Sequence, residues 1–121
     1  MNLIDITRDG DTLAMGGVNV ALPEAVAADV RGSSEQNFVL GARPEHLHLV
    51  EGGAPASVTV VEELGSEAFL HCQLMHEGTE KTIVVRVEGE TAITRGDNVQ
   101  VGINGPIHVF VKSSGVRLGE G

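Results

Sequence analysis

Residues 38–47 of the chain, with the sequence FVLGARPEHL, decide the fold. The stretch begins with a short apolar run, Phe38 to Leu40, of the kind found in buried β-strands. Pro44 lacks a backbone N–H and cannot lie in a central strand, so we predict a tight turn or a single helical turn from Arg43 to His46. The strand pattern returns at His48, directly after this turn. The stretch therefore predicts short strands joined by compact turns.

The same short apolar runs, separated by glycine-containing turns, extend in both directions. We predict further strands at residues 3–7, 11–15, 18–22, 57–62, 67–74, 82–87, 99–103 and 107–111, with breaks at residues 51–55 and 76–78. Residues 23–31 have helical character, because a proline and a glutamate open the segment and Gly32 closes it. Strands at spacings of about 8–12 residues predict an all-β fold, a small closed or half-closed barrel of antiparallel strands with one short helix.

Alternation along the later strands separates an inward face from an outward face. The inward residues are Leu70, Cys72, Leu74, Ile83, Val85, Val87, Val99, Val101, Ile103, Ile107, Val109 and Val111. Their neighbours Phe69, His71 and Gln73 then point outward, as do His108, Phe110 and Lys112. An outward phenylalanine needs cover. Either the strands within residues 3–22 fold over this face, or a protein partner contacts Phe69, Phe110 or both.

Length and composition limit the class of protein. The chain has 121 residues, of which 41% are hydrophobic, and this supports one domain over residues 1–121. With 17 acidic and 8 basic side chains, a net charge of -9 and only three aromatic residues, it lacks the surface of a nucleic-acid-binding protein. We see no apolar run that approaches the ~20 residues of a membrane span, and no signal peptide. A single cysteine favours a reducing cytoplasm.

The sequence offers no catalytic motif. Neither of its two lysines follows a glycine-rich loop, so we expect no ATP site. The five histidines lack the spacing of a zinc site, and we expect no metal. Cys72 lies on an apolar face, where a thiol stays protonated and unreactive. Glu62, Glu63 and Glu67 flank one turn and are interpreted as solvated edge charges. We therefore expect that this chain is not an enzyme.

Several short motifs, taken together, resemble one domain family. They are Gly41-Ala42-Arg43-Pro44-Glu45-His46-Leu47, the segment VVEELGSE at residues 60–67, GDNV at 96–99, IHVF at 107–110, GVRL at 115–118 and the initial Met1-Asn2. The first resembles the Gly-x-Arg-Pro-Glu-x-(Leu/Ile) signature of the C-terminal regulatory domain, often called TOBE, of ATP-binding subunits in ABC importers of the maltose and glycerol-3-phosphate type. The motifs occur in the order of that family and span almost the whole chain.

The resemblance implies an OB-like barrel that follows a nucleotide-binding domain absent from this chain. It implies a non-catalytic role in ATP-driven sugar uptake, with ATP and Mg²⁺ in the missing domain and no cofactor in this one. The implied partners are a second copy of this domain, its own nucleotide-binding domain, the permease subunits and a regulatory protein. The implied location is cytoplasmic, at the inner face of the cell membrane.

The resemblance also assigns residues to roles. Glu62, Glu67, Phe110 and Gly115 fall in segments that the family uses for pairing and regulation, and the outward faces add Phe69 and His108 to this predicted interface. Gly41, Arg43, Pro44 and Glu45 resemble the structural turn of the family, with Arg43 tied to a nearby carboxylate.

Two rival functions are weaker. The alternative to the regulatory domain is a free-standing module that binds a ligand or an oxyanion, as related barrels of molybdate systems do. An anion site needs Lys, Arg or clustered backbone N–H groups, whereas this chain is acidic and has two lysines. An RNA-binding OB fold conflicts with the same charge and with the scarcity of aromatic residues.

Overall fold

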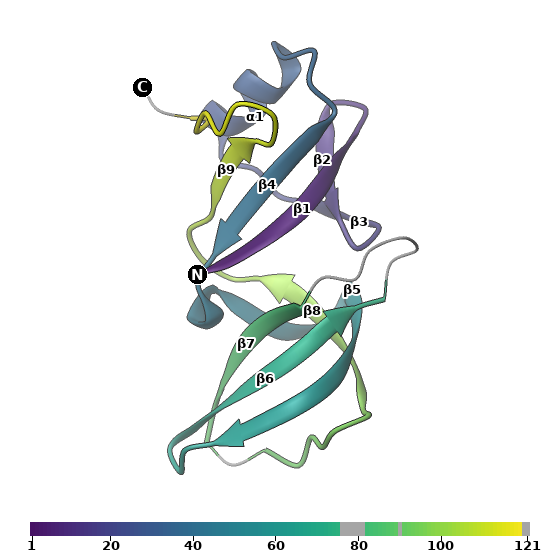
Figure 1. Ribbon diagram of the computed structural model, residues 1–121, viewed down its shortest axis with the longest axis vertical. Helices are drawn as coiled ribbons and strands as arrows, with labels where there is room; N and C mark the ends of the chain where they lie inside the picture. Colours follow the sequence, from purple (N-terminus) through teal and green to yellow (C-terminus); the bar gives the residue numbers. More distant parts are fainter. Residues whose placement is uncertain (76–81, 90, 120–121) are drawn as a thin grey trace.

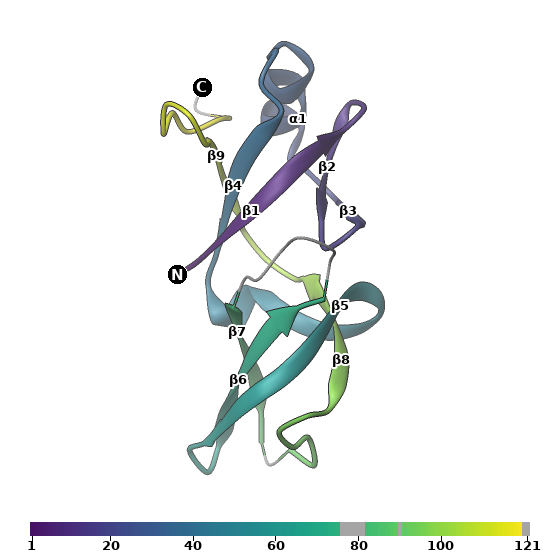
Figure 2. The same cartoon turned by 45° about the vertical axis from the view of Figure 1, so that its right-hand side comes forward.

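The computed structural model describes residues 1–75, 82–89 and 91–119, which form two antiparallel sheets and one α-helix (Figures 1 and 2). Sheet A has the order β3-β2-β1-β4-β9 and sheet B has the order β7-β6-β5-β8. The strands of sheet A are β1 (Asn2–Asp9), β2 (Thr12–Met15), β3 (Val18–Val20), β4 (Asn37–Ala42) and β9 (His108–Val111). Those of sheet B are β5 (Leu47–Glu63), β6 (Glu67–Leu74), β7 (Thr82–Glu88) and β8 (Asn98–Ile103). The helix α1 (Glu24–Arg31) follows β3, and a 3-10 helix η1 (Pro44–His46) joins the sheets.

The predicted all-β class, the antiparallel pairing, the single short α-helix and the proline turn are confirmed. The predicted break at residues 51–55 is wrong, because these residues lie inside the long strand β5. The pairing of β5 with β8 shifts register between Leu49 and Ala54, so a bulge absorbs the glycines. Pro55 is opposite Gln100 in this ladder. The turn predicted at residues 76–78 lies outside the described residues.

One cluster of buried apolar side chains holds the two sheets together. Phe38 and Leu40 contribute from sheet A, Leu70 and Ile83 from sheet B, and all four are fully buried. Alternation predicted the inward residues of the later strands correctly: most are buried, and Val87, Val99, Ile103 and Ile107 are partly buried against the same cluster. Helix α1 packs Val30 into the same cluster. The expectation of a single domain over residues 1–121 stays a prediction.

The chain crosses from sheet A to sheet B and then returns. After β8 it re-enters sheet A as β9, which pairs with β4 over four residues, from Phe38 opposite Val111 to Gly41 opposite His108. Sheet A therefore contains strands from both ends of the sequence, with all of sheet B inserted between β4 and β9.

Asn2 ties the start of β1 to the edge strand β7. Its Nδ2 donates to the carbonyl oxygen of Val84 at 2.8 Å, and its Oδ1 accepts from the N–H of Val84 at 2.9 Å. Asn2 is buried, so both of its polar groups need these partners. One side-chain amide thus acts as a short piece of β-ladder between the two sheets.

We predict that Asn2→Ala destabilises the fold, because it leaves the partly buried N–H and C=O of Val84 without their partner. The expected loss is about 1–3 kcal/mol in the free energy of unfolding, measured by urea denaturation. Asn19→Ala is the matched control, since Asn19 is exposed on β3, and it should change the free energy little. Equal losses in both variants would contradict the role given to Asn2.

Gly53 lies where β5 passes closest to β8, and we predict that Gly53→Ala is destabilising. A Cβ at this position would lie 2.6 Å from the carbonyl oxygen of Val101, a contact with backbone that cannot rotate away. The expected loss is about 1–3 kcal/mol, read from the thermal midpoint. Gly32→Ala is the control, because Gly32 ends α1 at φ -83° and an added Cβ would lie 3.6 Å from the nearest atom. The thermal midpoint of this variant should stay the same or rise.

Candidate functional site

The outer face of sheet B carries three of the predicted interface residues. Glu62 of β5 is opposite Phe69 of β6, and Phe69 is opposite Arg86 of β7, so these three side chains form one row across the sheet. Glu67 and His71 lie two residues from Phe69 on either side and share its face. The half-buried Phe69 ring is therefore set among charged and titratable groups.

Two polar pairs border Phe69. The Oε2 of Glu67 accepts a hydrogen bond from the Nε of Arg86 at 2.5 Å, and His71 Nε2 contacts the carboxylate of Glu62. The hydrogen bond and charge of Glu67 raise the pKa of the Arg86 guanidinium, and the charges of Glu88 and Glu45 add to the effect. Each pair joins neighbouring strands, so the polar rim around Phe69 is fixed by the sheet.

The outer face of sheet A carries two further predicted residues. His108 and Phe110 of β9 are opposite Gly41 and Val39 of β4. Leu3 of β1 is opposite Gly41 on the other side and is 57% exposed. A Cβ on Gly41 would lie 3.2 Å from the sulfur of Met1, so the glycine leaves room for that side chain.

Gly115, the last predicted interface residue, lies in the turn that follows β9. It adopts φ 75°, a conformation that favours glycine, and its N–H donates to the carbonyl oxygen of Val111. The chain then runs back along β9, and Arg117 forms a bridge opposite Phe110. Gly115 therefore shapes the segment that borders Phe110.

The six predicted residues thus fall into two groups on different sheets. Glu62, Glu67 and Phe69 lie on sheet B, whereas His108, Phe110 and Gly115 belong to β9 and the turn after it. The alternative in which residues 3–22 cover Phe110 is wrong. Strands β1 to β3 extend sheet A sideways from β4, because their backbone groups hydrogen-bond edge to edge, and they do not cross its face.

The Gly-x-Arg-Pro-Glu stretch forms the turn that the sequence predicts. Pro44 begins η1, and the N–H of His46 donates to the carbonyl oxygen of Arg43 at 2.9 Å. The expected tie between Arg43 and a carboxylate is wrong for the described part of the chain, where Arg43 is exposed and has no ion pair. Glu45 instead acts on Arg86 by its charge. The turn is held by its backbone and by the ring of Pro44.

Two models of known protein domain families match this chain. Residues 1–47 match the MalK OB fold domain, and residues 40–110 match the TOBE domain. The chain belongs to the TOBE domain family. The boundary between the two matched segments falls at β4 and η1, and the TOBE segment ends on β9, the strand that pairs with β4. The two family segments therefore share sheet A.

Three relatives of this TOBE domain carry the same name, UgpC. The sn-glycerol-3-phosphate import ATP-binding protein UgpC of Cereibacter sphaeroides is 34% identical over 122 residues, which cover 98% of this chain and 32% of the relative. UgpC of Bordetella pertussis is 36% identical over 128 residues, covering 98% of this chain and 33% of the relative. UgpC of Salmonella typhimurium is 42% identical over 76 residues, which cover 59% of this chain and 20% of the relative. The chain spans about a third of the length of the first two.

Two residues with structural roles in the TOBE domain, Asn2 and Arg86, were not predicted from the sequence. Asn2 entered only as part of a motif, and nothing in its neighbourhood predicted a contact with Val84, which is distant in the sequence. Arg86 could have been found, because alternation along residues 82–87 places it on the face opposite Ile83 and Val85.

Metal-binding groups, unpaired buried polar atoms and membrane-spanning helices were also sought in the described residues. The described ranges 1–75, 82–89 and 91–119 contain no group of three His, Cys, Asp or Glu side chains that could hold a metal ion. His108 Nδ1 is buried and finds no hydrogen-bond partner among these residues. No helix in the described part of the chain is long and apolar enough to cross a membrane.

Burial raises the pKa of the Cys72 thiol to about 11, as the apolar face predicts. At pH 8 we therefore expect iodoacetamide to alkylate Cys72 about a hundredfold more slowly in the folded protein than in the unfolded chain, because the thiolate is the nucleophile. A raised folded-state pKa also means that stability is lost as the pH rises from about 8.5, the ordinary thiol pKa, towards 11. Mass spectrometry after timed alkylation measures the rate.

The matched control for this prediction moves the thiol by one residue along β6. In the double variant Cys72→Ala, Gln73→Cys the new thiol lies at an exposed position of the same strand. It should react in the folded state at nearly the rate of the unfolded chain. Rapid alkylation of Cys72 in the native protein would show that the strand opens more readily than its burial implies.

Proposed function

We propose that this chain is the regulatory and dimerisation domain of the ATP-binding subunit of an ABC importer for glycerol-3-phosphate or a related carbohydrate. The observation that carries the proposal is the match of 98% of this chain to a third of the UgpC subunits. A domain that accounts for a third of such a subunit leaves two thirds for the nucleotide-binding part.

In this proposal the chain does not hydrolyse ATP. ATP and Mg²⁺ bind to the nucleotide-binding domain, which lies outside this chain, and the permease subunits contact the assembled protein. The full-length subunit works in the cytoplasm, at the inner face of the membrane. This domain holds two subunits together while their nucleotide-binding domains open and close, and it offers a surface to a regulatory protein.

The two outer faces support a role in protein contacts. Phe69 is a half-buried aromatic ring bordered by the Glu67–Arg86 pair, and interfaces commonly have such an apolar centre with a charged rim. Val60 lies opposite His71 on the same face and is 49% exposed. On sheet A, Phe110 is half-buried and lies opposite Arg117 of the tail, which runs antiparallel to β9. Aromatic side chains in such positions are frequent hot spots.

We expect Phe69→Ser and Phe110→Ser to weaken pairing of the full-length subunit. Removing an aromatic hot spot should raise the dissociation constant of the dimer at least about tenfold for one of them. Sedimentation equilibrium measures the constant, and circular dichroism checks that each variant folds.

Ala25→Ser is the matched control, because Ala25 is an exposed apolar residue on α1, an element that carries neither phenylalanine. It should pair like the unchanged protein. If the unchanged full-length subunit is a monomer at high micromolar concentration, the dimerisation role is wrong. If both phenylalanine variants pair normally, the contact surface lies elsewhere on the domain.

A further inference from the structure

The outer faces of the two sheets differ in charge. On sheet A, Lys112 Nζ donates to Asp5 Oδ2 at 3.2 Å, and Arg117 lies opposite Phe110. Leu3 adds an exposed apolar side chain to this face. The face of sheet A therefore combines apolar groups with charges of both signs. Two copies of such a face can meet without a concentration of like charge, since the cations of one copy can lie near the anions of the other.

The charges on sheet B are mostly negative. We call the outer face of β5, β6 and β7 around Phe69 the Phe69 face. Glu62 is opposite Phe69 on this face, and Glu67 is opposite Glu88. Arg86 is the only lysine or arginine in β5, β6 and β7 as the structure describes them. The Phe69 face thus has more carboxylates than permanent cations.

The one guanidinium leaves part of this charge unbalanced. Arg86 Nε donates to Glu67 Oε2 at 2.5 Å, whereas the carboxylate of Glu88 has no hydrogen bond or ion pair among the described residues. Glu67 and Glu88 are directly opposite on neighbouring strands, where like charges destabilise a sheet. At the margin of the face, Glu63 and Arg95 line one hollow, and their charges offset each other. The Phe69 face can therefore accept a further cation beside Glu88.

Apolar side chains lie beside these carboxylates. Phe69 and Val84 are partly buried, and Val60 is 49% exposed. His71 lies between the two valines, opposite Val60 on β5 and Val84 on β7. Contact surfaces between proteins often have an apolar centre within a polar rim, and aromatic side chains at the centre contribute much of the affinity. The Phe69 face has this arrangement.

The same charges oppose pairing of this face with its own copy. In a twofold contact a patch meets the same patch of the other subunit, so Glu62, Glu67 and Glu88 would be brought towards their own copies. One arginine in each copy does not neutralise them. Like charges placed together across an interface act against that partner, whereas opposite charges select for it. The surface that complements the Phe69 face is therefore basic and apolar.

We propose that the Phe69 face binds a partner protein other than a second copy of this chain, through a surface in which lysine or arginine lies beside apolar side chains. The cation of the partner lies next to Glu88, and its apolar side chains cover Phe69 and Val60. This assignment rests on the proposed function, in which the domain offers a surface to a regulatory protein. Pairing between subunits is left to the outer face of sheet A around Phe110.

The test uses the 121-residue chain and two synthetic helical peptides. One peptide has a stripe of leucines bordered by lysines, and the other has glutamate in place of each lysine. We expect the lysine peptide to shift the NMR signals of Val60, Phe69 and Glu88, and to bind at least about tenfold more tightly than the glutamate peptide. Equal affinities, or shifts confined to other parts of the domain, would overturn the proposal.

Two variants separate the charge from the apolar centre. Glu88→Gln removes the unbalanced carboxylate and leaves the Glu67–Arg86 pair in place, so the lysine peptide should bind about threefold more weakly. Phe69→Ser removes the aromatic ring, so the same peptide should bind at least about tenfold more weakly while circular dichroism shows an unchanged fold. Should Phe69→Ser unfold the domain, Glu88→Gln decides the matter, because Glu88 is exposed and its replacement keeps the shape of the side chain.

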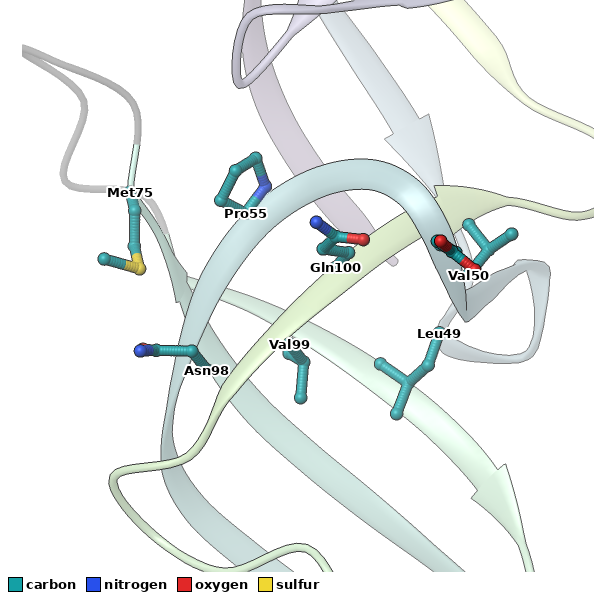
Figure 3. A pocket seen from close by; sticks show the side chains of 8 residues that line it. Leu49, Val50, Pro55, Met75, Asn98, Val99 and Gln100 are labelled. Atoms are coloured by element: carbon teal, nitrogen blue, oxygen red, sulfur yellow. The ribbon is translucent and has the colours of Figure 1, made fainter.

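The controls come from another exposed surface of sheet B. A hollow of about 620 Å³ next to β8 is lined by Val50, Glu51 and Met75 among other residues (Figure 3). Met75 follows the last residue of β6, about 20 Å along the strand direction from Phe69. Val50→Ser and Glu51→Gln, at exposed positions, should therefore leave the affinity for the lysine peptide unchanged. If Glu51→Gln weakens binding as much as Glu88→Gln does, the peptide follows the net charge of -9 and the proposal is wrong.

Sedimentation equilibrium of the full-length subunit separates this site from subunit pairing. The loss of pairing of at least about tenfold should belong to Phe110→Ser and not to Phe69→Ser. If Phe69→Ser alone dissociates the dimer, the Phe69 face belongs to a second copy and the proposed partner is wrong. If the unchanged subunit is a monomer while the lysine peptide still binds at the Phe69 face, the proposed dimerisation fails and this site stands.

Discussion

The pairing of β4 with β9 is the constraint on which the rest of the structure depends. It joins residues 38–41 to residues 108–111 and returns the chain to sheet A after all of sheet B has been built. Without this ladder β4 would become an edge, and the inner side of sheet A would lose Val109 and Val111 from its core. The segment matched to the MalK OB fold would then lack a strand supplied by the TOBE segment. Long-range strand pairing of this kind carries a high loop-closure entropy, so the shared buried cluster must offset it.

Much of the local structure could be predicted from the sequence. The period of two identified the inward residues of β6 and β8, and the proline at position 44 predicted η1. Alternation says which face of a strand is buried, but it does not say which strand is its neighbour. The division into two sheets therefore could not be predicted. Gly52, Gly53 and Pro55 are typical turn residues and predict a break, whereas the ladder with β8 shows that β5 continues through them with a bulge.

The candidate interface shows the same limit. Sequence alternation placed Phe69 and Phe110 on outward faces, and both are half-buried on those faces. Their separation onto different sheets depends on pairing, which no local pattern contains. The hydrogen bonds of Asn2 to Val84 and the charge pair of Glu67 with Arg86 belong to the same class, because their partners come from distant strands. Tertiary placement, not residue type, gives these side chains their roles.

The position of β1 has a mechanical consequence. It is the central strand of sheet A, hydrogen-bonded to β4 along residues 2–7 and to β2 near its end. A force applied to Met1 along the strand axis acts on many of these hydrogen bonds at once, so the strand resists by shear and does not peel away bond by bond. The two hydrogen bonds of the Asn2 side chain to Val84 also transmit part of this force to sheet B, at the first residue of the ladder. Any segment joined to Met1 is thus anchored to a stiff body, and its displacement moves both sheets together.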